Sequence, residues 1–225
     1  GAIGGVDVRG GSPGTRETDL LRPLHRVERV HAITLSGGSA FGLEAASGVM
    51  GYLADNGIGL HVGPAKVPIV ASAILFDLGI LSNRSFPGVE EGRTACRNAS
   101  LAPISQGTVG AGTGATVGKI LGVERAVKSG IGSACIRLPS GPAVAALVAV
   151  NAIGGITDHH DSTILAGPRL ENDRGYYDSV ELLLDEQVTE LTPPFSNTTI
   201  GIVATDARIT KEEANFVAQV SHDGL

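Results

Sequence analysis

Tryptophan is absent from this 225-residue chain, and aromatic residues make up only 4% of it. A core so poor in rings has to be built from Val, Ile, Leu and Ala, with close backbone packing at some of the 32 glycines. Apolar residues account for 42% and charged residues for 18%, and no unbroken apolar run reaches the roughly 18 residues of a membrane span. The composition therefore predicts a globular protein with one large domain and no membrane partner.

The chain also lacks a basic block, and its formal net charge is −6. Nucleic-acid-binding surfaces need clustered Lys and Arg, so we expect no nucleic-acid partner. Cysteine is scarce: Cys96 and Cys135 form no CxxC pair, and we expect buried thiols rather than a disulfide framework or a metal site. Because the chain begins at Gly1 and ends at Leu225, we expect it to be truncated at both ends, and we expect the cytoplasm as its compartment.

Apolar patterning predicts strands mixed with helices. Residues 30–36 favour a buried strand, residues 37–42 form a glycine-rich turn, and residues 43–56 carry apolar side chains on one helical face, with Gly57 as the C-terminal cap. The turn is similar to a phosphate-binding turn, but the segment has neither GxGxxG nor GK[ST]. The alternative is that its glycines let the helix pack close to the sheet.

The remaining elements are predicted from the same patterns. Hairpins mixed with a few helices indicate the α+β class, in which helices cover packed sheets. We expect strands at the start of residues 1–23 and in 67–78, and a hairpin of two strands in 133–138 and 143–150. We expect helices in 90–101, in 177–188 and after the capping box of Thr210 and Glu213. Residues 162–173 are expected to form a surface loop.

Several polar side chains stand among small or apolar residues. Lys119 follows the run GTVGAGTGATVG and is either a solvated tip or the single positive charge of an active site. Asn151 ends an apolar strand, where its amide could donate to a developing oxyanion or could form a turn. Asp77 is expected to accept backbone N–H bonds. The loop DHHD at residues 158–161 lacks a supporting Cys or His cluster, so we predict no metal there.

Thr198 opens a β-prone run after a loop with two prolines. Cutting the peptide bond between Asn197 and Thr198 would free an α-amine beside the Thr198 hydroxyl, and such an amine is the base of the Thr/N-terminal-amine pair. Its ordinary pKa of roughly 7.7–8.0 leaves much of it neutral near pH 7–8. The alternative is a strand that begins after a loop, with Thr selected for its β propensity.

Seven motifs, in one order along nearly the whole chain, resemble the DmpA-type aminopeptidase family, which includes β-aminopeptidases and the nylon-oligomer hydrolase. They are PGTRETDL at residues 13–20, LSGGSAFGL at 35–43, VPIV at 67–70, ILFDL at 74–78, GAGTGA at 110–115, AVNA at 149–152 and NTTIG at 197–201.

The resemblance implies an N-terminal-nucleophile hydrolase fold, a four-layer αββα sandwich with its own strand connectivity. Family members are made as one inactive chain that cuts itself once. Here the cut would divide one domain, residues 1–225, into an α-chain part, residues 1–197, and the start of a β chain, residues 198–225. The resemblance further implies homotetramers of αβ units and no metal or organic cofactor.

Individual positions match the family's motifs. Thr198 matches the nucleophile, and Asn197 with Thr198 forms the cleavage junction. Lys119 matches a lysine implicated in catalysis by the nylon hydrolase, and Asn151 matches the strand-end Asn expected to stabilise the oxyanion. Phe76 stands where that hydrolase has a Tyr, and we assign it to the substrate pocket together with Gly37, Gly38 and Ser39. The resemblance also implies an acidic Asp-Gly-Asp-Thr segment near the nucleophile, or a Ser/Glu pair as in some members, downstream of the position where these 225 residues stop.

The function implied is a self-processing amidohydrolase or aminopeptidase, acting on the N-terminal residue of small peptides or on amides and esters. One alternative is a Thr-dependent acyltransferase like the ornithine acetyltransferases, which pass the acyl group to an amine instead of water. The other alternative is a non-catalytic small-ligand-binding scaffold with residues 37–42 as its pocket.

Overall fold

The computed structural model describes residues 1–80, 86–172, 174–185 and 197–225. Its first sheet has the order β2 (Thr15–Arg16), β7 (Val70–Ile74) and β4 (Ala32–Ser36). β4 and β7 are parallel, and β2 is antiparallel to β7. The crossover from β4 to β7 runs through a 3-10 helix (Ser39–Glu44), α1 (Ala45–Asp55) and the hairpin β5 (Leu60–Val62) and β6 (Ala65–Val67), as a parallel pair requires.

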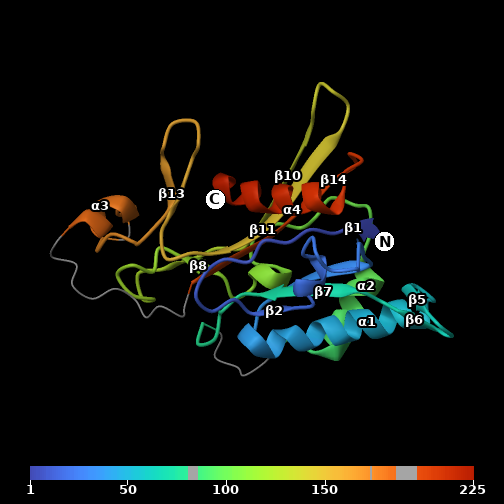
Figure 1. Cartoon of the computed structure of the whole chain (residues 1–225). Helices are drawn as coiled ribbons and strands as arrows, with labels where there is room; N and C mark the ends of the chain where they lie inside the picture. The colour runs from blue at the N-terminus through green and yellow to red at the C-terminus, as the bar shows by residue number, and fades with distance from the viewer. Residues whose placement is uncertain (81–85, 173, 186–196) are drawn as a thin grey trace.

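A layer of helices covers this sheet (Figure 1). α1 packs Ala46, Val49 and Leu53 against Val70 of β7, and α2 (Val89–Asn98) lies across α1. The predicted helices at 43–56 and 90–101 are thus confirmed within a few residues, and Gly57 takes the positive φ of a C-terminal cap. Added Cβ atoms would collide with facing backbone at several glycines: Gly48 with Val89 O, Gly92 with Ala45 O, and Gly42 with Gly37 O.

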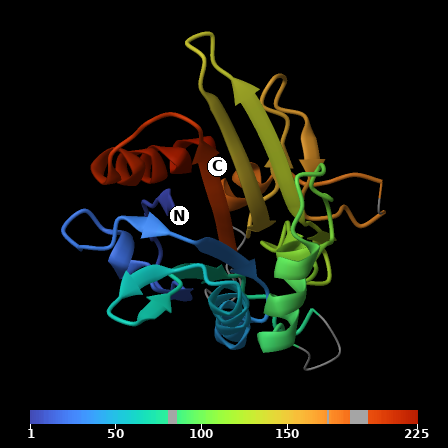
Figure 2. The same ribbon diagram turned by 90° about the vertical axis from the view of Figure 1, so that its right-hand side faces the viewer.

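The second sheet is antiparallel, in the order β10 (Ile131–Arg137), β11 (Ala143–Asn151) and β14 (Thr198–Thr205). Its hairpin, predicted from sequence, projects from the body of the protein (Figure 2). Between the two sheets lies a core of Leu75, Ala111, Ala115 and Ala149, against which Leu35 of β4 and Ile200 of β14 pack. The aliphatic, ring-poor core expected from the composition therefore joins β4 to β14.

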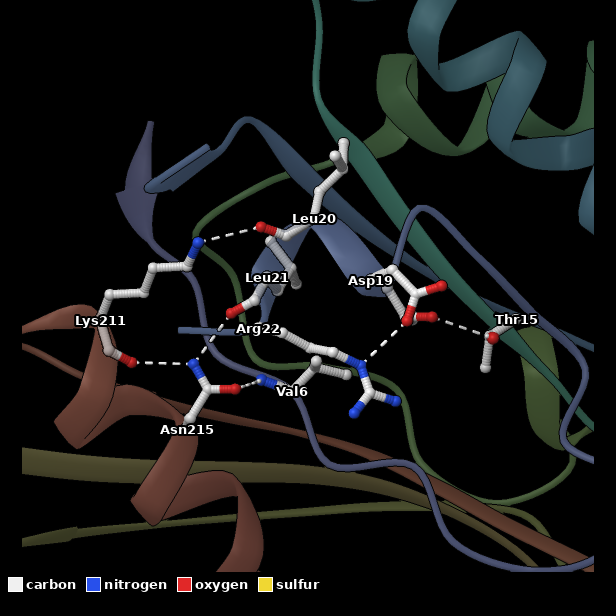
Figure 3. A network of polar contacts seen from close by, with 9 residues as sticks. Val6, Thr15, Asp19, Leu20, Leu21, Arg22, Lys211 and Asn215 are labelled. Carbon is white, nitrogen blue, oxygen red and sulfur yellow. Dashed lines mark hydrogen bonds and ion pairs between the residues drawn. The ribbon is translucent and has the colours of Figure 1, made fainter. Parts of the chain in front are cut away.

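α4 (Lys211–Val220) follows β14 and is tied to the beginning of the chain. Its predicted capping box is confirmed, since Thr210 and Glu213 each accept a backbone N–H from the other. Lys211 Nζ donates to Leu20 O at 3.0 Å, and Asn215 Nδ2 donates to Leu21 O at 2.8 Å (Figure 3). Asn215 Oδ1 accepts from Val6 N at 3.2 Å. The helix after β14 and residues 6–25 thus form one unit.

Two local expectations were wrong, and a third is confirmed only in part. The helix expected at 177–188 is the shorter α3 (Ser179–Leu184), because Asp178 caps its start and extended backbone at Asp185 ends it. None of its residues is buried, and residues 186–188 lie outside the described part. The expected loop at 162–173 contains β13 (Ile164–Ala166), paired with β12 (Ile156–Thr157). Cys135 is exposed because β10 leaves the body beyond Ser133, whereas Cys96 is half-buried, and neither forms a disulfide.

Short elements complete the description. Within the described residues, no helix has the length and apolar character needed to cross a membrane. The short strands are β1 (Ala2–Ile3), β3 (Arg29–Val30), β8 (Thr116–Val117) and β9 (Val127–Lys128), and the further 3-10 helices are Asp19–Leu21, Gly110–Gly112 and Ser221–Gly224.

Candidate active site

Thr198 is the first residue of β14 and pairs with Asn151, the last residue of β11. This register places the ends of two neighbouring strands side by side, close to the residues that follow β7. There the backbone N–H of Phe76 donates to Thr198 Oγ1 at 3.2 Å. A hydroxyl that accepts a hydrogen bond from a peptide N–H is better able to carry the negative charge that develops on a nucleophilic oxygen.

The Asn151 side chain is 1% exposed and its amide has a fixed orientation. Its Nδ2 donates to Phe76 O at 2.7 Å. Its Oδ1 accepts from Thr116 N at 3.0 Å, from Thr116 Oγ1 at 3.3 Å and from Lys119 Nζ at 2.8 Å. Three donors on one side and a carbonyl on the other leave a single orientation of the amide that satisfies them. Asn151 is therefore a buried strand residue, and the alternative of a turn former is wrong.

Lys119 is also 1% exposed, so the alternative of a solvated tip is wrong. Its Nζ donates to the backbone O of Asn151 at 3.0 Å as well as to the side chain. Removing the ammonium from water lowers the pKa of Lys119 from 10.5 to about 8. The chain can turn inward here because Gly118 has φ +70°, and a Cβ at Gly118 would collide with the backbone of Gly167.

The glycine-rich turn at residues 37–42 is joined to this site through Asp77. Gly38 N donates to Asp77 Oδ1 at 2.6 Å, which confirms Asp77 as an acceptor of backbone N–H bonds. Gly37 and Gly38 are buried and Ser39 is partly buried. Asp77 is the chain neighbour of Phe76, so the turn reaches Thr198 through residues 75–77.

The structure thus brings together Thr198, Asn151, Lys119 and the backbone of Phe76, with Gly37, Gly38 and Ser39 one step further away. The sequence reasoning missed Thr116, which is 5% exposed and supplies two of the donors to Asn151. The signal was its place three residues before Lys119 in the run of small residues. Asn197 Oδ1, at the predicted junction, is buried and has no hydrogen-bond partner among the residues that the structure describes.

Two surface cavities lie apart from these residues. One of about 420 Å³ is lined by Glu124, Arg125, Arg169, Leu170 and Glu171. The other, of about 390 Å³, is lined by Val6–Val8, Arg22–His25, Asn215 and Gln219. Neither is lined by Thr198, Asn151 or Lys119, so neither belongs to the candidate site.

In the loop between β12 and β13, Asp158, His159 and His160 bring one potential ligand atom each within 4.8 Å of one another. Both histidines are exposed, and the Asp158 carboxylate already accepts the backbone N–H of His160 at 2.8 Å. The absence of a metal site from this loop stays a prediction.

Comparison with known proteins places the chain in a family. Residues 1–225 match Peptidase family S58, and the chain belongs to this family. It is 40% identical over 244 residues to an uncharacterised aminopeptidase of Mycobacterium leprae, covering all of this chain and 62% of that protein. It is 31% identical over 235 residues to a 6-aminohexanoate-oligomer endohydrolase of an Agromyces species, again covering all of this chain and 61% of the relative.

Among solved structures, a Pyrococcus horikoshii protein aligns with a TM-score of 0.62 at 26% identity, over 99% of this chain and 55% of that one. The resemblance to DmpA-type aminopeptidases is confirmed, and a mixed α/β fold agrees with it. The family is one of peptidases, and its named relatives support the hydrolase class. The chain spans only about 62% of the length of the curated relative from Mycobacterium leprae.

Proposed function

We propose that this chain belongs to a self-processing hydrolase in which Thr198 cuts the Asn197–Thr198 bond and then acts as an N-terminal nucleophile. The observation that carries the proposal is the hydrogen bond from Phe76 N to Thr198 Oγ1, in a backbone position that Asn151 and Lys119 hold from behind. A strand-opening Thr selected only for β propensity needs none of these buried polar partners.

Self-cleavage is the first stage. Thr198 Oγ attacks the carbonyl carbon of Asn197, and the carbon–nitrogen bond breaks after the nitrogen has gained a proton. Asn197 is then an ester on Thr198 Oγ. Water hydrolyses this ester, which releases a chain ending in the carboxylate of Asn197 and leaves Thr198 with a free α-amine. The Phe76 N–H stabilises the charge on Oγ as the attack begins.

Substrate turnover is the second stage. The Thr198 amine accepts the hydroxyl proton as Oγ attacks the carbonyl of a small peptide, amide or ester. Asn151 stabilises the tetrahedral oxyanion, and Lys119, bonded to Asn151 Oδ1, polarises the amide. Water then hydrolyses the acyl-threonine. An amine acceptor in place of water would make the same site an acyltransferase.

The architecture and assembly are proposed at the same level. The helices α1 and α2 with the two sheets form three layers of what we propose is a four-layer αββα sandwich. The cut would leave residues 1–197 and 198–225 on separate chains of one domain, assembled as a homotetramer of αβ units in the cytoplasm without a cofactor. The processed chains would stay joined through the pairing of β11 with β14 and through α4.

The test starts from the full-length protein rather than residues 1–225. Wild type, Thr198→Ala and Thr199→Ala are expressed, and each product is analysed by denaturing gels and intact mass. Thr199 is the matched control because it neighbours Thr198 in β14 and pairs with Val150. We expect cutting between Asn197 and Thr198 in wild type and in Thr199→Ala, and none in Thr198→Ala.

Wild type that stays uncut would overturn the proposal, as would cutting at another bond. The cut enzyme is then incubated with a panel of small amides, esters and N-terminal peptides, with and without an amine acceptor. Free acid as the only product supports the hydrolase. Transfer of the acyl group to the amine would assign the site to acyl transfer instead.

A further inference from the structure

Residues 75–77 follow β7 and lie between the glycine-rich turn at residues 37–42 and the start of β14. The peptide unit between Leu75 and Phe76 bridges them: its carbonyl, Leu75 O, accepts from Ser39 N at 2.9 Å, and its N–H, on Phe76, donates to Thr198 Oγ1. The orientation of this one peptide therefore decides whether an N–H points at the Thr198 hydroxyl. Whatever holds the turn at Gly38 and Ser39 also holds that peptide.

The turn is held by Asp77. Gly38 and Ser39 have φ values of +84° and +53°, and the N–H groups of both residues donate to residues 75–77. Gly38 N donates to Asp77 Oδ1 at 2.6 Å, and Ser39 N donates to Leu75 O. A positive φ at a residue other than glycine costs energy and persists where the surroundings compensate for it. The carboxylate and the carbonyl of residues 75–77 supply that compensation.

Asp77 is 8% exposed, and its second carboxylate oxygen, Oδ2, lies against Gly37 and Gly114. A Cβ at Gly37 or at Gly114 would collide with Asp77 Oδ2, and neither glycine has a positive φ. Their lack of a side chain is therefore required by the carboxylate and not by their own backbone conformation. Gly114 comes from the segment between Gly110–Gly112 and β8, so Asp77 joins three separate parts of the chain.

We propose that Asp77 is a positioning residue for the self-cleavage reaction. By fitting its carboxylate between Gly37, Gly38 and Gly114, it sets the turn whose Ser39 N–H orients the Leu75–Phe76 peptide toward Thr198 Oγ1. This inference rests on the proposed function, because it concerns the first bond that the protein cuts. Asp77 itself has no role in the chemistry at Thr198.

The test uses the full-length protein made in a cell-free translation, with self-cleavage followed on denaturing gels after a pulse of label. Asp77→Ala removes the acceptor of the Gly38 N–H and should slow cutting on the order of 10–100-fold, since misplacing the Leu75–Phe76 peptide by about 1 Å can cost that much in rate. Asp77→Asn keeps an acceptor oxygen of the same shape and restores most of the rate. A charge-assisted hydrogen bond is roughly twice as strong as a neutral one, so the rescue is incomplete.

A double-mutant cycle separates positioning from general damage. Gly37→Ala slows cutting in the wild type, because the added methyl group displaces the Asp77 carboxylate. The three atoms nearest to that methyl group all belong to the carboxylate, so in the Asp77→Ala background Gly37→Ala has little further effect. Gly132→Ala is the control: Gly132 is exposed in β10 and has no positive φ, and of the described atoms only Gln106 Oε1 would lie near an added Cβ, at 3.8 Å. Melting temperatures are measured for every variant.

The outcomes separate this inference from the proposed function. Wild type that never cuts overturns the proposed function. Wild type that cuts while Asp77→Ala cuts equally fast overturns the role of Asp77 alone. Equal slowing by Asp77→Ala and Asp77→Asn, additive effects of Asp77→Ala and Gly37→Ala, or rates that follow the melting temperatures would each reduce Asp77 to a structural residue and refute the positioning role.

Discussion

Replacing Lys119 by Met should slow self-cleavage without destabilising the fold. Met has a similar volume and fills the buried space, but it cannot donate to the side-chain and backbone oxygens of Asn151, which accept from Lys119 Nζ at 2.8 and 3.0 Å. Hydrogen bonds to a charged group contribute about 1.5–3 kcal/mol each. If about 2 kcal/mol of that is lost from the transition state, the rate falls about 30-fold.

The stability of Lys119→Met depends on two opposing effects. The pKa of Lys119 is lowered from 10.5 to about 8 by burial, which corresponds to about 3 kcal/mol. The unfolded chain binds more protons than the folded one between these values, so this penalty acts fully below pH 8 and disappears as the pH rises toward 10.5. Lys119→Met has no such penalty, but it leaves the backbone oxygen of Asn151 without its buried Nζ donor, which costs about 2 kcal/mol. Its melting temperature should therefore stay close to that of wild type at pH 6–7 and fall below it as the pH rises above 8.

The rate of self-cleavage gives the matching pH test. Before the cut, Thr198 has no free amine, so its titration cannot contribute. If the Lys119 ammonium polarises Asn151, the first-order rate constant of the wild type falls as the pH rises through about 8, and that fall is missing in Lys119→Met. Lys66→Met is the control, because Lys66 is an exposed lysine that donates to Gly57 O.

The assay is pulse-labelled cell-free translation sampled on denaturing gels, with calorimetry for the melting temperatures. Cutting of Lys119→Met at the wild-type rate would refute a role for Lys119 in the reaction. Slow cutting accompanied by a large drop in melting temperature would refute the argument that Met replaces the buried lysine without structural damage.

Two further predictions concern α4 and the cysteines. Lys211→Met leaves Leu20 O and His25 O without their buried donor, and Asn215→Ala leaves Leu21 O without a donor and Val6 N without an acceptor. Each substitution should cost about 2 kcal/mol of stability and lower the melting temperature by about 4–8 °C. Calorimetry against Lys66→Met measures the change, and an unchanged melting temperature would contradict the anchoring of α4. Cys135 is exposed, whereas burial raises the pKa of the Cys96 thiol despite the nearby Arg93. A thiol reagent at pH 8 should therefore label Cys135 faster than Cys96. The Cys135→Ser variant isolates the labelling rate of Cys96, and equal rates for the two thiols would contradict the burial of Cys96.

Local signals predicted the elements whose causes are local. The apolar face and the glycine cap of α1, the hairpin of β10 and β11, and the capping box of Thr210 and Glu213 depend on residues a few positions apart. α3 shows the limit of such reasoning. Its apolar spacing continues past Leu184, but within the described residues none of its side chains is buried, and the helix ends at the extended backbone of Asp185.

By itself, the sequence determined the family, the class of fold, and Thr198, Asn151 and Lys119 as the residues to examine, because motifs in one order survive without coordinates. Only the tertiary structure decided what these residues touch. A lone lysine after small residues suits a solvated tip and a buried site equally well, and the register of β11 against β14 depends on a core built from distant segments. The sequence indicated that Asp77 accepts backbone N–H bonds, but only the tertiary structure decided that Gly38 is the donor. The backbone of Phe76 and the donors of Thr116 carry no signal in residue type, since they arise where the two sheets pack together.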